Sequence, residues 1–501
     1  MDSFQHILNG FVTATEPMNL VYTFLGCLMG TMIGVLPGIG PAAGIALLIP
    51  ITFGMNPTSA LIMMAGIYYG AMYGGSTTSI LLNIPGEAAS VVTCIDGYQM
   101  ARKGRAGAAL TVSAVGSFVA GTISIFGLMI AASALANVAL KFGPPEFFAI
   151  GVCGLLLLAR LSGGSVFNSF IMILLGIAVS TVGLDFVTGE ERFTFGVYEL
   201  GQGIEFLPVA MGLFGIAEVL ETAERKEQSR SVLKVRLREL LPTREEWRRS
   251  IHPIWRGSVL GFLIGLIPGP SPVISTFVSY LVEKKLSKYP EEFGQGAIEG
   301  VAGPEAANNA AVGGAYVPLM ALGIPFTPAM AVILGALMLH NITPGPNLIS
   351  EKPELFWGVI ASMYIGNIML VVLNLPLVNV FVSILKIPRQ ILLPCIVLLC
   401  LIGVYSINAS YLDLIVLVIF GYVGYILRGL GFQPAPLILA MVVGPMIETS
   451  LRQSLKITGG NPGPLFFRPI CLTLYLAVFL AFFLPLAIRT FKKKMHRLSP
   501  F

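Results

Sequence analysis

The sequence predicts an all-α polytopic membrane protein with two inverted-topology repeats, each containing a broken helix or re-entrant hairpin. Composition gives the first reason: of 501 residues, 55% are hydrophobic and 11% are charged, against roughly 25% charged in soluble domains. Mean hydropathy is +0.82. Apolar runs at 20–34, 111–140 and 472–488 approach or exceed the roughly 20 residues that cross a hydrocarbon core.

Several function classes are disfavoured by what the sequence lacks. The net charge of +5 is too small to indicate a nucleic-acid partner. No Lys or Arg precedes Arg102, so a cleaved signal is not expected and the first apolar segment should remain. No GxxxxGK[ST] motif supports an ATP-driven pump. The four histidines are dispersed and the six cysteines lack CxxC spacing, so we expect no enzyme, no cofactor and no resident metal.

Basic segments indicate which loops are cytoplasmic, because Lys- and Arg-rich loops stay inside. These segments lie at 101–105, 224–250, 283–288 and 489–497. The first 17 residues and 185–191 are neutral or acidic and suit the outer side. The amino terminus is therefore predicted outside and the carboxyl terminus inside. One conflict remains, because charge places Arg452 and Lys456 inside whereas counting the crossings places them outside.

The same rule divides the chain into four parts. We predict a first transmembrane repeat at 1–223, a cytoplasmic basic connector at 224–256, and a second, inverted repeat at 257–430. Residues 431–501 should hold C-terminal membrane segments and a basic cytoplasmic tail.

A proline–glycine interruption occurs twice in nearly the same form. "GVLPGIGP" at 34–41 returns 231 positions later as "GLIPGPSP" at 265–272. Basic segments flank 257–281 on both sides, so a single crossing would put one of them on the wrong side. We predict that 257–281 enters from the cytoplasm and returns, and that 18–53 does the same from outside. The alternative is that both interruptions are surface turns between spanning helices.

A second echo supports duplication. Asn83-Ile84-Pro85 is matched by Gly323-Ile324-Pro325 at an offset of 240, and the predicted crossings between motifs run in opposite directions. Inverted repeats with discontinuous helices surround the midplane site of many secondary transporters. A duplicated scaffold without transport remains the alternative, because a fold does not fix a function.

The predicted site has no permanent cation. Neither 1–101 nor 289–351 contains Lys or Arg. Helix starts predicted at Gly86, Ser271 and Thr327 would offer free N–H groups to a carboxylate, and oxygen-bearing side chains could bind a hard cation. The candidates for substrate or cation binding are Gly38, Gly40, Ser76, Thr77, Thr78, Asn83, Pro85, Gly269, Ser271, Asn308, Asn309, Pro325 and Thr327.

Three acids are candidates for coupling, because an ionisable group inside a membrane is costly and usually functional. They are Glu87, Asp96 and Glu305. Two alternatives stay open: Asn308 and Asn309 could only join packed helices, and Glu305, beside Pro304, could lie at an interface.

Long strings carry a family resemblance over nearly the whole chain. "GVLPGIGP", "GGSTTSILLNIPGEAASVVTCIDGYQMARKGRAGAAL", "GPEAANNAAVGGAYVPLMALGIPFTPAMAVILGALMLHNITPGP" and "APLILAMVVGPMIETSLRQSL" resemble the large membrane subunit of tripartite tricarboxylate transporters. The resemblance implies an inner-membrane permease of bacteria that works with a small membrane subunit and a periplasmic solute-binding protein. It further implies Na⁺- or H⁺-coupled import of citrate or related di- and monocarboxylates, by an elevator-like motion. A channel on the same scaffold is the alternative function.

Overall fold

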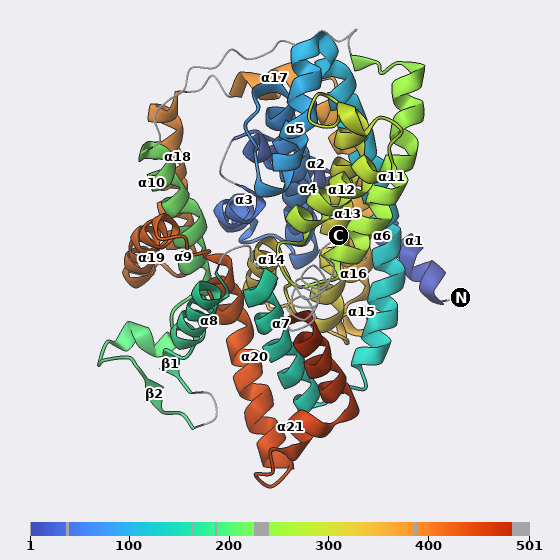
Figure 1. Cartoon of the computed structure of the whole chain (residues 1–501). Coiled ribbons are helices and arrows are strands. Elements are labelled where there is room, and N and C mark those ends of the chain that lie inside the picture. The colour runs from blue at the N-terminus through green and yellow to red at the C-terminus, as the bar shows by residue number, and fades with distance from the viewer. Residues whose placement is uncertain are drawn as a thin grey trace, which may run out of the picture. The chain divides into compact units, whose positions relative to one another are not determined.

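The chain is described by a computed structural model covering residues 2–36, 40–161, 165–185, 188–224, 240–384 and 388–482. It divides into two compact units, Met1–Ala139 with Glu205–Leu430 and Leu140–Ile204 with Gly431–Phe501 (Figure 1). Six helical stretches of the described chain are long and apolar enough to cross a membrane: Pro17–Val35, Ala88–Ala139, Phe206–Glu224, Pro353–Asn374, Tyr411–Gly429 and Ala435–Ile457. The prediction of an all-helical, multi-pass membrane protein is confirmed at this level.

Both predicted helix breaks are present in the first unit. Helix α2 (Pro17–Val35) ends shortly before α3 (Gly40–Leu48), and α11 (Arg244–Gly265) ends shortly before α12 (Ser271–Leu286). Pro268 and Pro270 cannot donate backbone hydrogen bonds and so interrupt the second pair. The candidate Gly38 lies outside the described residues.

Each hairpin is followed by a long helix that ends at the repeated motif. Helix α4 (Pro57–Leu82) ends at Asn83, with φ of 56°, and α13 (Glu299–Leu322) ends at Gly323, with φ of 72°. A left-handed residue is a common helix terminator, so the 240-residue echo marks equivalent helix ends. After α4 come η2 (Ala88–Ser90) and α5 (Val91–Met100), and after α13 comes α14 (Pro328–Leu339).

Glycines bring the helices of each half into backbone contact. A Cβ added to Gly26, Gly30 or Gly34 of α2, or to Gly257, Gly261 or Gly265 of α11, would lie 2.1–2.5 Å from a carbonyl oxygen. The carbonyls facing α2 belong to Met63, Ile67 and Ala71 of α4, and those facing α11 belong to Gly303, Ala307 and Ala311 of α13. The two sets of glycines differ by 231 positions and the two sets of carbonyls by 240, which are the offsets of the sequence echoes. The two helix pairs therefore pack in the same register.

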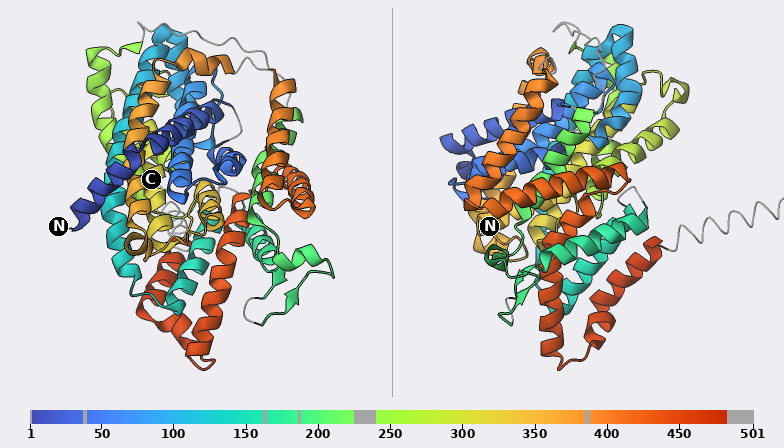
Figure 2. Two further views of the ribbon diagram at one scale, coloured as in Figure 1. Left: turned by 180° about the vertical axis from the view of Figure 1, so that it is seen from behind. Right: turned by 90° about the vertical axis from the view of Figure 1, so that its left-hand side faces the viewer.

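Other helices complete the first unit around these pairs. Helix α6 (Ala106–Ala139) packs on α13, and α1 (Asp2–Thr15), dark blue in Figure 2, packs along α16 (Pro353–Asn374). The remaining elements are η1 (Ile49–Thr52), η3 (Ala101–Arg105), α9 (Phe206–Ala210), η5 (Met211–Ile216), α10 (Ala217–Glu224), η7 (Pro290–Glu292), α15 (Leu348–Glu351), α17 (Val378–Ile384), α18 (Arg389–Asn408) and α19 (Tyr411–Gly429).

The second unit joins two distant parts of the chain. Helix α20 (Ala435–Ile457) packs on α7 (Pro144–Leu161) and α8 (Val166–Ser180). A short hairpin of β1 (Gly183–Leu184) and β2 (Glu191–Arg192), the 3-10 turn η4 (Tyr198–Gln202) and α21 (Gly463–Phe467) complete it. Arg452 of α20 donates to both carboxylate oxygens of Asp185, at 3.0 and 2.8 Å. Arg452 is thus paired with the segment predicted to lie outside, and the side of the membrane on which both lie stays a prediction.

The compact units group the chain by contacts, whereas the predicted division into repeats concerns membrane topology and stays a prediction. Residues 140–204 fall within the predicted first repeat, 1–223, yet they pack with the C-terminal part. Of the predicted connector, 224–256, residues 225–239 lie outside the described chain, and Arg244 already begins α11. The basic tail after residue 482 also lies outside the described residues.

We expect the glycine contacts to be essential for folding. In Gly261→Ala, the new Cβ would lie 2.2 Å from the Ala307 carbonyl oxygen, and overpacking of this kind costs about 1–3 kcal/mol. The thermal midpoint of the purified protein in detergent should therefore fall. Gly429→Ala is the control, because no atom lies within 4 Å of its added Cβ. Equal midpoints for the two variants would contradict this account of the helix pairs.

Candidate functional site

Glu305 on α13 is the centre of a buried polar cluster. Its side chain is 1% exposed and accepts hydrogen bonds from Ser76 of α4, Thr93 of α5 and Ser113 of α6. The Ser113 Oγ to Glu305 Oε2 distance is 3.0 Å. No Lys or Arg side chain of the described chain forms an ion pair with Glu305. Three hydroxyls from the first half of the chain thus converge on an acid from the second half.

The neighbouring asparagines extend this cluster in two directions. Asn308 Nδ2 donates to Glu87 Oε1 at 2.9 Å, and Asn309 Nδ2 donates to Ser117 Oγ at 2.7 Å. Both asparagines are 0% exposed, and neither Oδ1 has a hydrogen-bond partner within the described residues. These two buried amide oxygens are therefore left to accept a hydrogen bond or to bind a cation.

The loops that follow α4 and α13 lie against the helix breaks. A Cβ on Gly86 would lie 2.2 Å from the carbonyl oxygen of Gly34 at the end of α2. In the other half, the backbone N–H of Gly269, in the α11–α12 break, donates to the carbonyl of Phe326 at 2.9 Å. The candidate Pro325 is buried beside that carbonyl, whereas Pro85 is half-buried. Each break is therefore joined to its own repeated motif.

One predicted helix cap is confirmed and two are displaced by one residue. Thr327 caps α14, and its Oγ1 accepts from Met330 N at 3.2 Å. Glu87, not Gly86, caps η2, and forms a capping box with Ser90. Ser271 is the first residue of α12, with Pro270 in the cap position and Gly269, at φ of +132°, just before it. The buried hydroxyl of Ser271 has no hydrogen-bond partner in the described part of the chain.

Tyrosines connect the two motifs and were not found from the sequence. The Tyr68 hydroxyl of α4 lies near the side chain of Thr327, and its ring lies 6.3 Å from that of Tyr316 on α13. Tyr68 precedes Asn308 by 240 positions, as Glu87 precedes Thr327. Equivalent helix positions of the two halves thus each contact the cap residue of the opposite half.

The other candidate residues are placed as follows. Thr77 is buried, and Thr78 Oγ1 donates to the Gly75 carbonyl at 3.1 Å. Gly40 begins α3 with φ of +54°. Asn83 is exposed and adopts the left-handed conformation that ends α4, so its side chain lies outside the buried cluster.

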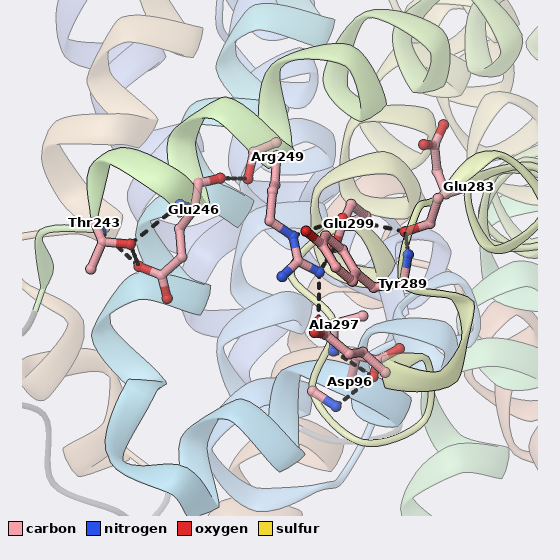
Figure 3. A network of polar contacts seen from close by, with 12 residues as sticks. Asp96, Thr243, Glu246, Arg249, Glu283, Tyr289, Ala297 and Glu299 are labelled. Atoms are coloured by element: carbon pink, nitrogen blue, oxygen red, sulfur yellow. Dashed lines mark hydrogen bonds and ion pairs between the residues drawn. The ribbon is translucent and has the colours of Figure 1, made fainter.

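Asp96 fastens α5 to the loop before α13 (Figure 3). Its Oδ1 accepts from the backbone N–H groups of Gly294, Gly296 and Ala297 at 2.7–2.9 Å, and its Oδ2 accepts from the Tyr280 hydroxyl at 2.8 Å. These four donors all come from the second half of the chain, so the carboxylate joins the two halves.

Ion pairs hold α11 against α12 and against the segment that leads into α13 (Figure 3). Arg249 of α11 bonds to Glu299 at 2.8 Å and to Glu292 at 2.6 Å, and Arg256 pairs with Glu283 of α12. Partial burial of Glu246 opposes its charged form, but hydrogen bonds from Arg105 and Thr243 outweigh burial and lower the pKa of Glu246. The middle of α11 therefore lies beside the end of α12, and the start of α11 is tied to η7 and to the first residue of α13.

Comparison with known proteins places this architecture in a family. The sequence model described as "Tripartite tricarboxylate transporter TctA family" matches residues 20–439. The chain belongs to the TctA family. It is therefore a subunit of a tricarboxylate-type transporter that functions with other components, and the family is one of transporters rather than enzymes.

Two curated proteins are similar to this chain. The TctA chain is 50% identical over 481 residues to an uncharacterized 52.8 kDa protein in the TAR-I ttuC' 3' region of Agrobacterium vitis, covering 96% of this chain and 95% of that protein. It is also 50% identical over 214 residues to an uncharacterized protein in the TAR-II ttuC' 3' region of the same organism, covering 43% and 88% respectively. No solved structure matches the chain.

The placement of Asn83 generates a prediction. Because its exposed side chain ends α4 at positive φ, Asn83→Gly should fold and transport normally. A β-branched residue tolerates this conformation poorly, at a cost of about 1–3 kcal/mol, so Asn83→Val should lower the thermal midpoint of the purified protein. Loss of transport in a stably folded Asn83→Gly variant would instead show that the amide takes part in binding.

Proposed function

We propose that this TctA protein is an ion-coupled secondary transporter that imports a carboxylate delivered by a periplasmic solute-binding protein. The observation that carries the proposal is the Glu305 cluster. A buried carboxylate without a basic partner is costly in its charged form. Binding of a cation, either Na⁺ or H⁺, stabilises such a site, and loss of the cation removes that stabilisation.

We place the carboxylate substrate beside this cation, between the two helix breaks. The N-termini of α12 and α14 carry partial positive charge, and the surrounding segments supply no basic side chain. A substrate with two or three negative charges would be costly to desolvate there alone. A bound cation offsets that cost, and thermodynamic linkage requires that each ligand raises the affinity of the other by the same factor.

We further propose that the two hairpins enter from opposite sides of the inner membrane, as an inverted repeat with elevator-like motion. The shared glycine register supports duplication, and the positions of the basic segments support inversion. In this arrangement the amino terminus is periplasmic and the carboxyl terminus cytoplasmic. The partners are a small membrane subunit and the periplasmic binding protein, and the substrate is citrate or a related di- or monocarboxylate.

Transport in vesicles tests the central proposal. Labelled di- and tricarboxylates should enter in a saturable manner, only with the binding protein present and only under an imposed Na⁺ or proton gradient. Asn308→Ala leaves Glu87 Oε1 without its donor, which costs about 1–3 kcal/mol, or roughly 5- to 150-fold in affinity. It should weaken the apparent affinities for substrate and cation together, and Glu305→Gln should remove the dependence on the cation.

The control is Lys284→Ala, an exposed position at which transport should not change. Ohmic conductance of the carboxylate would favour the channel instead. Substrate affinity that is independent of both Na⁺ and pH would contradict the coupling proposal.

Cysteine labelling tests the proposed orientation of the hairpins. Gly257 and Glu283 are buried, so exposed positions at the hairpin ends are better probes. With the exposed Cys395 replaced by Ser, Leu241→Cys and Lys288→Cys should both react from the cytoplasmic side. Met18→Cys and Asn56→Cys should both react from the periplasmic side. Reaction of all four from one side would contradict inversion.

A further inference from the structure

A stripe of polar side chains runs between α6 and α13, away from Glu305. We call it the α6–α13 polar stripe, and its members are Ser113, Ser117 and Ser124 of α6 and Glu305, Asn309 and Tyr316 of α13. They recur at spacings of four and seven residues, which keeps them on one face of each helix. All six are at most 4% exposed. Buried polar residues thus continue for about 16 Å along α13, at 1.5 Å per residue.

Hydrogen bonds connect the members of the stripe nearest Glu305. Ser113 bonds to Glu305, and Asn309, one turn further along α13, bonds to Ser117 at 2.7 Å and to the Glu305 carbonyl at 3.2 Å. Ser124 faces the next turn, because a Cβ on Gly313 would lie 2.3 Å from its Oγ.

The far end of the stripe reaches the second repeated motif. Tyr316 lies one turn beyond Gly313, and its ring centroid lies 6.3 Å from that of Tyr68, whose hydroxyl is near Thr327 at the start of α14. The stripe therefore connects the Glu305 cluster with the start of α14, beside the α11–α12 break.

Helix packing alone does not account for this composition. Small residues such as Gly, Ala and Ser suffice to bring membrane helices together, whereas Asn309 and Tyr316 are larger and polar. Asn309 Oδ1 and Tyr316 OH have no hydrogen-bond partner in the described part of the chain. Burying an unpaired polar atom costs about 1–3 kcal/mol, so two such atoms on one stripe point to an occupant that supplies the missing interactions.

We propose that the α6–α13 polar stripe is the path by which the coupling cation passes between the second helix break and Glu305. The hydroxyl and amide oxygens of the stripe suit a partly hydrated Na⁺. They also suit a proton, because each hydroxyl can accept a proton on oxygen and pass on its own. The inference rests on the proposed function, since it assigns a route to the cation that Glu305 binds.

The test uses variants that remove one oxygen each, with matched controls. Tyr316→Phe and Ser117→Ala delete hydroxyls of the stripe. Tyr364→Phe deletes a half-buried hydroxyl outside it, which hydrogen bonds to Met129 Sδ at 3.5 Å. Ser258→Ala deletes a buried hydroxyl on α11 that bonds to the Ile254 carbonyl. Thermal unfolding of each purified variant establishes that it is folded.

The readouts are cation-driven uptake into vesicles, measured over a Na⁺ series and a pH series, and binding of labelled substrate at saturating cation. We expect Tyr316→Phe and Ser117→Ala to lower the rate of cation-driven uptake by about fivefold or more, the effect of about 1 kcal/mol. Their substrate affinity at saturating cation should match that of the unchanged protein. Which series shows the loss identifies the cation as Na⁺ or H⁺.

Two results separate failure of the path from failure of the proposed function. If both stripe variants match Tyr364→Phe and Ser258→Ala while Glu305→Gln abolishes cation dependence, the path is wrong and the proposed function stands. If Glu305→Gln itself keeps normal cation dependence, the proposed function is wrong, and the path is wrong with it.

Discussion

In the proposed arrangement both helix breaks lie inside the membrane, where lipid cannot satisfy the backbone N–H and C=O groups that a broken helix leaves, so protein must cover them. At one break the Gly34 carbonyl lies against Gly86, and at the other the Gly269 N–H donates to Phe326. In both halves the segment that covers the break is the loop after the long helix. The breaks can exist only where these loops meet them, and so they stay inside the protein.

This arrangement requires the hairpins to lie unusually close to the long helices. The six glycines of α2 and α11 place helix backbones in direct contact with carbonyls of α4 and α13, which favours weak Cα–H···O contacts and close van der Waals packing. Any side chain at these positions would push the hairpin outward and move its break away from the loop. The spacing of glycines therefore fixes the position of the break, and the same spacing recurs in both halves.

The sequence predicted the breaks and the motif echo well, because proline, glycine and charge act locally. It could not supply the partners of Glu305, since Thr93 and Ser113 lie about 200 positions away and only tertiary packing brings their hydroxyls to it. In the sequence, Tyr68 and Tyr316 lie in ordinary apolar runs. Only the packing of α4 against α13 brings their rings together. The displaced cap at Ser271 follows a positive φ at Gly269, which sequence spacing does not resolve. The packing of 140–204 with the C-terminal part is likewise a long-range contact that no local pattern reports.

In the proposed function, the distribution of charged side chains explains why Glu305 can bind a cation. The basic side chains near the second hairpin form ion pairs with acids there, namely Arg105, Arg249 and Arg256. Among the described residues, no Lys or Arg forms an ion pair with Glu305. A permanent Lys or Arg beside Glu305 would neutralise it in every state, and the site would then gain nothing from a cation. Hydroxyl donors stabilise the carboxylate more weakly and leave room for exchange with a bound cation. In the proposed mechanism, coupling therefore depends on the absence of basic side chains from the centre as much as on the presence of the acid.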